Sequence, residues 1–248
     1  MLAEISGSAR AIGAVNTIVR RDGKLFGDNT DAAGLTLLLR KTGADLKGKK
    51  VLILGSGNTS ETAEYLAREN GADMFCAGCE MVGTNHREAE WRQLLAEVRK
   101  HYSGPVTYNC DKYQEDPITW WDAVDVISSS GYYPIDRLDA NMERIRKVTE
   151  RFGKPFMFME CGCPARNGSE YRPNDWAFGG ETDPEAQDKW YRAFTEALSR
   201  HPFVRGTGWW DWPGSRLYPE EAGKTTNGYC TYGKPANETL KKFAETCR

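Results

Sequence analysis

The stretch KPFMFMECGCPARNGS, residues 154–169, decides the fold prediction for this chain. Its first part, 155–160, is a continuous apolar run that ends in a carboxylate, Glu160. A strand of a parallel sheet is covered on both faces and shows such a run, whereas a half-buried antiparallel strand alternates apolar and polar residues. The run at 155–160 therefore predicts a parallel strand that ends in an acidic residue.

Strand-like runs recur along the chain, and helical patterns separate most of them. The eight candidate strands are AVNTIV (14–19), KLFGDN (24–29), KVLILG (50–55), ADMFCAG (72–78), PVTYN (105–109), VDVISS (124–129), PFMFME (155–160) and VRGTGWW (204–210). The candidate helices span 31–43, 58–70, 87–102, 141–152 and 184–200. This order predicts an α/β fold with a largely parallel sheet, either open or closed into a (β/α)8-like barrel.

The first two candidate strands are the exception to this order. Only residues 20–23 separate them, and these include Asp22 and Gly23. Asp-Gly between two apolar runs is typical of a hairpin turn rather than of a helical crossover. We therefore expect an antiparallel hairpin at 14–29.

The composition excludes several classes of function. The 248 residues carry 33 Lys and Arg against 35 Asp and Glu, a net charge of -2, so no broad basic surface for nucleic acid is expected. No apolar run approaches the roughly 20 residues that a membrane helix needs, and the N-terminus lacks the pattern of a signal peptide. The seven cysteines are an odd number in a chain large enough to bury a core, which favours reduced thiols. We expect a soluble, cytoplasmic protein without nucleic-acid or membrane partners.

The N-terminal motifs GAVNTIVRRDGKLFGDNTDAAG (13–34) and KGKKVLILGSGNTSETAEYLA (47–67) resemble shikimate dehydrogenase over about residues 3–70. In that family the matching positions Asn16, Asn29, Thr30 and Asp31 help to bind substrate, and the Asp works with a catalytic Lys. That Lys lies upstream of GAVNT and has no counterpart here, and the motif that binds the NADP phosphate does not follow residue 71.

The glycine turn of this segment has two interpretations. Gly55 and Gly57 lie between a predicted strand and a predicted helix, where backbone N–H groups can hold a phosphate of NADP. The third glycine of the dinucleotide-binding pattern is not cleanly present, so a plain strand-to-helix turn is the alternative. We expect no cofactor if the turn is only structural, and NADP if it is not.

From residue 72 onward the chain resembles family 113 of the glycoside hydrolases, which are (β/α)8 enzymes of clan A known for β-mannan hydrolysis. The resemblance is carried by ADMFCAGCEMVGTNHREAEWR (72–92), PVTYNCDKYQ (105–114), WWDAVDVISSSGYYP (120–134), KPFMFMECGCPARNGS (154–169) and VRGTGWWDW (204–212). Such enzymes carry one catalytic carboxylic acid at the end of the fourth strand and one at the end of the seventh. The matching residues are Glu80, as general acid/base, and Glu160, as nucleophile.

The chemistry of a retaining glycosidase agrees with this placement. One carboxylic acid protonates the leaving oxygen, and a carboxylate about 5 to 5.5 Å away attacks the anomeric carbon. Because alternate residues of a strand share a face, Glu80 lies on the face of Cys76 and Gly78, and Glu160 on that of Phe158. Without the motifs, each glutamate would be interpreted as a surface charge at a strand end.

Further sugar-binding residues are expected at the ends of the other strands. In the family a tyrosine after the sixth strand orients the nucleophile, and here either Tyr132 or Tyr133 matches it. Trp209 or Trp210 could form the floor under the sugar, although tryptophans beside a strand also serve as packing. Asn109 could bind sugar hydroxyls, or it could belong to an ordinary turn. No metal site is expected, since Cys76 and Cys79 point to opposite faces of one strand.

Two resemblances thus meet in one chain, and they predict a shikimate-dehydrogenase-like fragment at 1–71 and a partial glycoside-hydrolase barrel at 72–248 that can share one core. A Rossmann-type βα fragment would supply the N-terminal units of the barrel. We expect hydrolysis of β-mannosidic linkages in an oligosaccharide, weak because the first three native strands are missing. The alternatives are a recombined or engineered chimeric scaffold without catalysis and a residual NADP-binding oxidoreductase fragment. Open sheet edges would favour a homo-oligomer.

Overall fold

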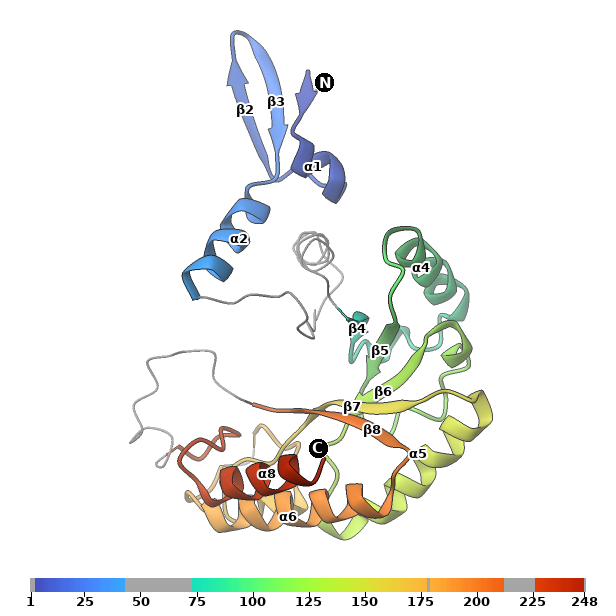
Figure 1. Cartoon of the computed structure of the whole chain (residues 1–248), viewed down its shortest axis with the longest axis vertical. Coiled ribbons are helices and arrows are strands. Elements are labelled where there is room, and N and C mark those ends of the chain that lie inside the picture. Colours follow the sequence, from blue (N-terminus) through green and yellow to red (C-terminus); the bar gives the residue numbers. More distant parts are fainter. Residues whose placement is uncertain (1–2, 43–72, 178, 212–225, 248) are drawn as a thin grey trace. The chain divides into compact units, whose positions relative to one another are not determined.

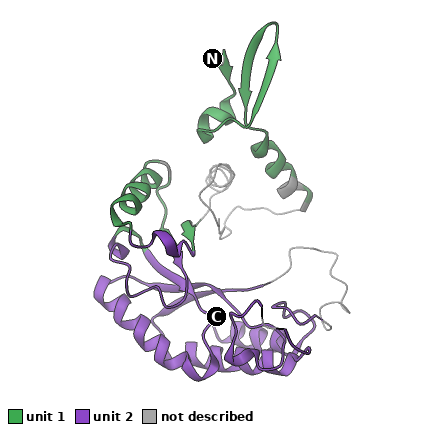
Figure 2. Cartoon of the chain, turned by 180° about the vertical axis from the view of Figure 1, so that it is seen from behind, with its two compact units in different colours: residues 1–79, 87–108, 123–125 green, residues 80–86, 109–122, 126–248 purple. Residues whose placement is uncertain are grey.

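The computed structural model describes residues 3–42, 73–177, 179–211 and 226–247. The chain divides into two compact units (Figure 2). The first comprises Met1–Cys79, Arg87–Tyr108 and Ala123–Asp125, and the second comprises Glu80–His86, Asn109–Asp122 and Val126–Arg248. The predicted strand at 50–55, the helix at 58–70, Gly55, Gly57 and the boundary at 71/72 lie outside the described residues.

The N-terminal residues form a small three-stranded sheet in the order β1-β3-β2 (Figure 1). β2 (Thr17–Arg21) and β3 (Lys24–Asp28) pair antiparallel, which confirms the predicted hairpin. The two residues between them have positive φ, 48° for Asp22 and 78° for Gly23. Such a turn matches the twist of the two strands, and Gly adopts positive φ without steric cost. β1 (Glu4–Ile5) adds to the hairpin in parallel with β3.

Two helices accompany this sheet, and a polar side chain caps the N-terminus of each. In α1 (Gly7–Ile12), the Ser6 hydroxyl accepts the Ala9 N–H at 3.1 Å. In α2 (Thr30–Thr42), the Asn29 side-chain oxygen accepts the N–H of Asp31 at 3.2 Å. These side chains satisfy backbone donors that the first turn of a helix leaves free. The expected helix at 31–43 is confirmed as α2, whereas neither β1 nor α1 was expected.

The larger sheet contains five described strands in the order β4-β5-β6-β7-β8 (Figure 1). Their bounds are β4 (Phe75–Cys79), β5 (Val106–Cys110), β6 (Val126–Ser130), β7 (Phe156–Cys161) and β8 (Val204–Trp209). β6, β7 and β8 run parallel, as the apolar run at 155–160 predicts. The protein is therefore an α/β protein with a parallel five-stranded sheet.

Helices follow the strands, and 3-10 turns η1 (Val82–Thr84), η2 (Trp121–Ala123), η3 (Ile135–Arg137) and η4 (Ser169–Tyr171) lie in the connections. The helices are α4 (Glu88–His101), α5 (Leu138–Phe152), α6 (Pro184–Arg200) and α8 (Pro235–Thr246). The first three confirm the predicted helices at 87–102, 141–152 and 184–200, with α5 starting three residues earlier than expected. α8, which packs on α6, was not expected.

β7 and β8 approach each other so closely that glycine is required at two positions. A Cβ on Gly208 would lie 2.2 Å from the Met159 carbonyl oxygen, and one on Gly162 would lie 2.0 Å from the Trp210 carbonyl oxygen. Both contacts are to backbone atoms, which cannot rotate away as a flexible side chain can. These glycines thus fix the strand ends at which the candidate site lies.

Candidate active site

Glu80 directly follows β4 and belongs to the second compact unit. Its backbone N–H donates to the Asn109 carbonyl oxygen at 2.7 Å, so the residue is held beside the end of β5. Its φ is 50°, in the left-handed region that a non-glycine residue adopts at a cost of about 1 kcal/mol. Such strain is found at functional sites more often than elsewhere. The Glu80 carboxylate accepts a hydrogen bond from the Ser130 hydroxyl.

Glu160 lies in β7, one residue before the strand ends. The Tyr132 hydroxyl donates to Glu160 Oε2 at 3.1 Å, and the Gly131 N–H donates to the Glu160 carbonyl oxygen at 2.6 Å. The register between β6 and β7 shifts just before this point, so that Ser130 faces Glu160. This bulge-like irregularity brings the residues that bond to the two carboxylates, Ser130 and Tyr132, to the same end of β6.

The two carboxylates interact electrostatically. Partial burial of the carboxyl group is the largest cause that raises the pKa of Glu80, although the residue as a whole is exposed, and the negative charges of Asp111 and Glu160 raise it further. The Ser130 hydrogen bond and the positive charge of Lys112 act in the opposite direction. A carboxyl group with a raised pKa holds its proton at higher pH, which suits it to act as a general acid.

The structure separates the two neighbouring tyrosines. Tyr132 reaches Glu160, and burial together with the Glu160 charge raises the pKa of Tyr132, so its hydroxyl stays a neutral donor. Tyr133 points elsewhere and donates to the buried Glu115 at 2.5 Å. Of the two predicted candidates, only Tyr132 is placed to orient Glu160.

Tyr133 belongs instead to a cluster of side chains at the loop that follows β5, in which Tyr133 and Glu115 are fully buried. Glu115 is fully buried and accepts from Arg144 at 2.8 Å, and Arg144 also binds Asp116. The Arg144 guanidinium lies 5.8 Å from the centre of the Tyr113 ring, within the range of a cation–π contact. This cluster ties the loop after β5 to α5.

The other predicted binding residues differ in their surroundings. Asn109 is fully buried and donates to the Ser130 hydroxyl at 3.2 Å, so direct contact with a sugar stays a prediction. Trp209 packs against aromatic rings of α6 and α8, with ring centres 5.6 Å from Tyr191 and 6.3 Å from Phe243. Trp210 is half-buried and is joined to Asp211 by a cis peptide bond. Its ring lies near that of Trp176, which belongs to a group of aromatic rings.

That aromatic group was not predicted from the sequence. Trp176, which is 59% exposed, lies 4.6 Å from Tyr229 and 6.4 Å from Trp210 between ring centres. Tyr229 in turn lies 5.9 Å from Tyr132. An exposed tryptophan supported by other rings is a surface on which a sugar ring can stack. The signal in the sequence was only a tryptophan in a loop, without the partners that make it informative.

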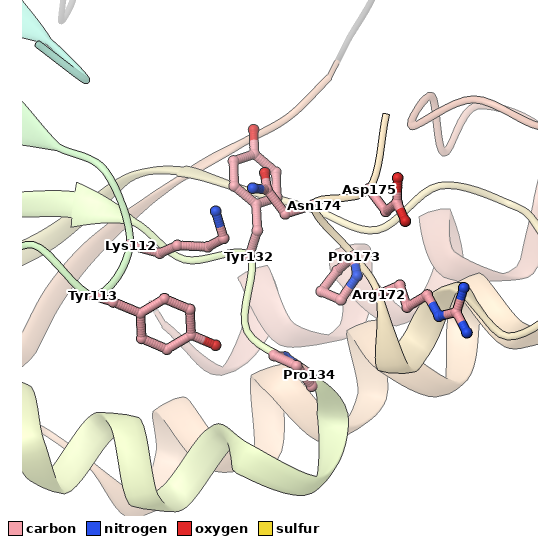
Figure 3. A pocket seen from close by; sticks show the side chains of 8 residues that line it. All are labelled: Lys112, Tyr113, Tyr132, Pro134, Arg172, Pro173, Asn174 and Asp175. Carbon is pink, nitrogen blue, oxygen red and sulfur yellow. The ribbon is translucent and has the colours of Figure 1, made fainter. Parts of the chain in front are cut away.

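A pocket of about 320 Å³ adjoins Tyr132 (Figure 3). It is lined by Lys112, Tyr113, Tyr132, Pro134, Arg172, Pro173, Asn174 and Asp175. Lys112 and Asn174 bring an amine and an amide to the pocket that the Tyr132 ring also lines (Figure 3). Polar groups together with aromatic rings suit a ligand that carries hydroxyl groups on an apolar ring. In the described ranges, no three His, Cys, Asp or Glu side chains gather as a possible metal site.

An α/β protein that presents two carboxylates at the ends of two strands of one sheet, here β4 and β7, with aromatic side chains around them, has the arrangement of a glycoside hydrolase. The comparison with known families agrees. The chain belongs to Glycoside Hydrolase Family 113, whose profile matches residues 58–234.

Solved structures of this family resemble the chain closely. A GH113 β-1,4-mannanase is 33% identical, with a TM-score of 0.77 over 99% of this chain and 86% of that one. The GH113 β-mannanase AaManA from Alicyclobacillus acidocaldarius, in complex with ManMIm, is 42% identical, with a TM-score of 0.69 over 74% of this chain and 58% of that one. A β-glucuronidase from an uncultured Clostridium sp., 14% identical with a TM-score of 0.55, shares only the fold.

Part of the chain is also similar to shikimate dehydrogenase (NADP(+)). The enzyme of Carboxydothermus hydrogenoformans is 43% identical over 76 residues, which are 31% of this chain and 27% of that one. The enzyme of Xanthomonas campestris is 52% identical over 59 residues, 23% of this chain and 21% of that one. The chain thus spans about a quarter of the length of these curated relatives. No described helix combines the length and apolar character that crossing a bilayer requires.

Proposed function

We propose that the chain is a retaining glycoside hydrolase that cleaves β-mannosidic linkages in oligosaccharides, with Glu80 as general acid/base and Glu160 as nucleophile. The observation that carries this proposal is the pairing of the two carboxylates. The negative charge of Glu160 contributes to the raised pKa of Glu80, so the two carboxyl groups interact electrostatically. Two carboxyl groups in different protonation states are what the retaining mechanism needs.

The residues divide the work as follows. Glu80 gives its proton to the glycosidic oxygen while the Glu160 carboxylate bonds to the anomeric carbon. Glu80 then takes a proton from the water that releases the sugar from Glu160. The hydrogen bond from Tyr132 to Glu160 Oε2 orients the carboxylate for the attack.

The substrate class rests on the similar solved structures, which are named β-mannanases and cover most of this chain. The pocket beside Tyr132 can receive a neighbouring sugar unit, and Trp176 and Trp210 offer rings for stacking. An oligosaccharide is therefore the proposed partner. No cofactor is needed for this chemistry, because both reacting groups are side chains of the chain itself.

We also propose that the sheet is part of a (β/α)8-like barrel whose first units come from residues 1–71. The five described strands correspond to the last five of such a barrel, and β4 and β8 form the two ends of their sheet. If the substituted units position the sugar less well than native ones, the rate is low, because misplacement by about 1 Å can cost a factor of about 100. Sheet ends that stay open favour a homo-oligomer. The cytoplasmic location stays a prediction.

The test is hydrolysis of β-1,4-mannotetraose by the purified chain, with Glu160→Gln as the inactive variant. Glu196→Gln is the matched control, because Glu196 is an exposed glutamate on α6. We expect Glu160→Gln to lower kcat/KM by a factor of at least about 1,000, since the covalent step is lost, and Glu196→Gln to change it little. Proton NMR of the first product should show retention of the anomeric configuration.

Equal activity in Glu160→Gln and the unchanged protein would refute the assignment. Absence of activity in all three proteins would favour the chimeric scaffold without catalysis. The oxidoreductase alternative depends on Gly55 and Gly57, and a fluorescence titration without NADPH binding at millimolar concentration would remove it.

A further inference from the structure

The Ser130 hydroxyl lies between Asn109 and the proposed acid/base, and the mechanism above leaves it without a role. Ser130 is the last residue of β6 and is fully buried. Its Oγ bonds to Glu80 Oε1 and to Asn109 Nδ2, the latter at 3.2 Å. A buried serine in contact with a reacting group is a candidate for a functional contact rather than for packing.

The direction of these hydrogen bonds follows from the groups involved. The amide nitrogen of Asn109 can only donate, so Ser130 Oγ accepts from it. The single hydrogen of the Ser130 hydroxyl is then available for Glu80 Oε1, which accepts it. The chain of donors therefore runs from Asn109 through Ser130 to Glu80.

We propose that Ser130 is a positioning residue that keeps Oε1 of Glu80 as a hydrogen-bond acceptor, so that Oε2 is the oxygen that carries the catalytic proton. The inference rests on the proposed function of Glu80 as acid/base. A carboxylic acid has one protonated oxygen, and an oxygen that already accepts a hydrogen bond from a fixed donor is the poorer place for that proton. Without Ser130, this contact no longer distinguishes Oε1 from Oε2 as the place for the proton.

The proton balance of both steps agrees with this role. In the first step the O–H bond at Oε2 breaks, its proton moves to the glycosidic oxygen, the bond from that oxygen to the anomeric carbon breaks, and Glu160 forms an ester with the anomeric carbon. In the second step a water oxygen bonds to the anomeric carbon, the ester breaks, and the proton from water returns to Oε2. Ser130 keeps its own hydrogen throughout.

The contact also changes the proton affinity of Glu80, which gives a readout independent of activity. A hydrogen bond donated to the charged carboxylate favours that form, so Ser130 lowers the pKa of Glu80. The other influences on this group are burial, Asp111 and Glu160, which raise the pKa, and Lys112, which lowers it. Replacing Ser130 by alanine leaves these in place and removes one stabilising donor.

The first measurement is a carboxyl titration by NMR of the full chain labelled with carbon-13 at the glutamate side-chain carboxyl, with Glu80→Gln to assign the signal. We expect Ser130→Ala to raise the Glu80 titration midpoint by about one pH unit and Ser130→Thr, which retains the hydroxyl, to restore it. Ser129→Ala is the matched control. Ser129 is a fully buried neighbouring serine of β6 whose hydroxyl has no hydrogen-bond partner among the described residues, so the midpoint should not move.

The second measurement compares two substrates with different needs for acid catalysis. With β-1,4-mannotetraose, Ser130→Ala should lose about 10- to 100-fold in kcat/KM, because its leaving group needs a proton. With 2,4-dinitrophenyl β-mannoside, whose leaving group departs as an anion, the loss should stay below about threefold. The alkaline limb of the mannotetraose profile should move to higher pH in Ser130→Ala.

The outcomes are distinct. An unchanged Glu80 midpoint in Ser130→Ala, or equal losses on both substrates, would overturn the positioning role. If the unchanged protein hydrolyses neither substrate, the proposed function fails, while the NMR titration still decides whether Ser130 donates to Glu80.

Discussion

The hairpin formed by β2 and β3 and the central strands β5 and β7 differ in how far their side chains are buried. In the hairpin, Ile18 is 60% exposed and Val19 is 39% exposed. In β5 all five residues are buried, and in β7 Phe156 and Phe158 are fully buried. The hairpin thus pairs its strands although Ile18 and Val19 stay exposed, whereas the apolar side chains of β5 and β7 form part of the core.

The polar contacts differ in the same way. Those of the N-terminal segment link neighbouring motifs, as where the Ser6 hydroxyl donates to Asp28 at 2.5 Å and the Thr30 N–H donates to Asn16 at 2.9 Å. Those of the candidate site join residues from different strands, such as Tyr132 and Glu160. The contact between Glu80 and Ser130 spans 50 positions, whereas that between Ser6 and Asp28 spans 22, so the candidate site depends on more distant parts of the chain.

The largest expected effect comes from the core of the larger sheet. Phe158 in β7 is fully buried, and its ring centre lies 4.8 Å from that of Phe156 and 5.5 Å from that of Phe194. We expect Phe158→Ala to lower the free energy of unfolding by about 3 to 5 kcal/mol, because it removes buried surface and leaves a cavity. Urea denaturation followed by tryptophan fluorescence measures this loss.

Phe158→Leu is the control for that experiment, since it keeps much of the volume and should cost about 1.5 kcal/mol or less. A loss below about 1 kcal/mol in Phe158→Ala would show that the core around β7 does not stabilise the sheet as proposed. Substitutions in β7 and in the exposed hairpin would then have similar effects on the free energy of unfolding.

The same difference explains how much was predictable from the sequence. The apolar runs at 72–78 and 155–160 predicted two strands with Glu80 and Glu160 at their ends, and in the structure Glu80 follows β4 and Glu160 lies within β7. The two tyrosines could not be separated, because adjacent residues point in different directions that depend on the bulge-like shift near Ser130. Glu115 was not predicted, because nothing in the sequence indicates that an acid between polar residues will be buried.

Ser130 and Trp176 show a second limit. A serine in the run VDVISSSG has no feature that distinguishes it from Ser128 or Ser129, and its contact with Glu80 spans 50 positions of the chain. Trp176 is a candidate for sugar stacking because its ring packs against Tyr229, which is similarly distant in sequence. A sequence pattern predicts which face of a helix or strand is buried. The roles of Ser130 and Trp176 depend instead on which distant segments pack against each other in the fold.

An intermediate effect is expected at Lys234, a buried lysine that precedes α8. Its amine donates to the Cys230 carbonyl oxygen at 2.6 Å, and burial lowers its pKa to about 8. The unfolded chain has an ordinary lysine pKa of about 10.4. Between these values the unfolded state binds the proton and the folded state does not, so the stability contributed by this group rises with pH.

Relative to Lys234→Met, the unchanged protein should therefore gain about 2 kcal/mol between about pH 8 and about pH 10. Urea denaturation at several pH values gives the difference, in which the titration of other groups cancels. Lys242→Met, which removes an exposed lysine of α8, controls for loss of a positive charge. A difference between the unchanged protein and Lys234→Met that is flat with pH would contradict the burial of this amine.

The smallest effect is expected in the hairpin, where Ile18 has little contact to lose. Ile18→Ala should change the free energy of unfolding by about 0.5 kcal/mol or less, since exposed substitutions rarely exceed this value. All eight tryptophans lie at residue 91 or later, so fluorescence reports the larger sheet and hydrogen exchange of β2 and β3 is needed to follow the hairpin itself. A loss above about 2 kcal/mol would mean that Ile18 is covered in solution. If that loss grows with protein concentration, a second copy of the chain covers the hairpin, because association stabilises a folded state in proportion to the logarithm of concentration.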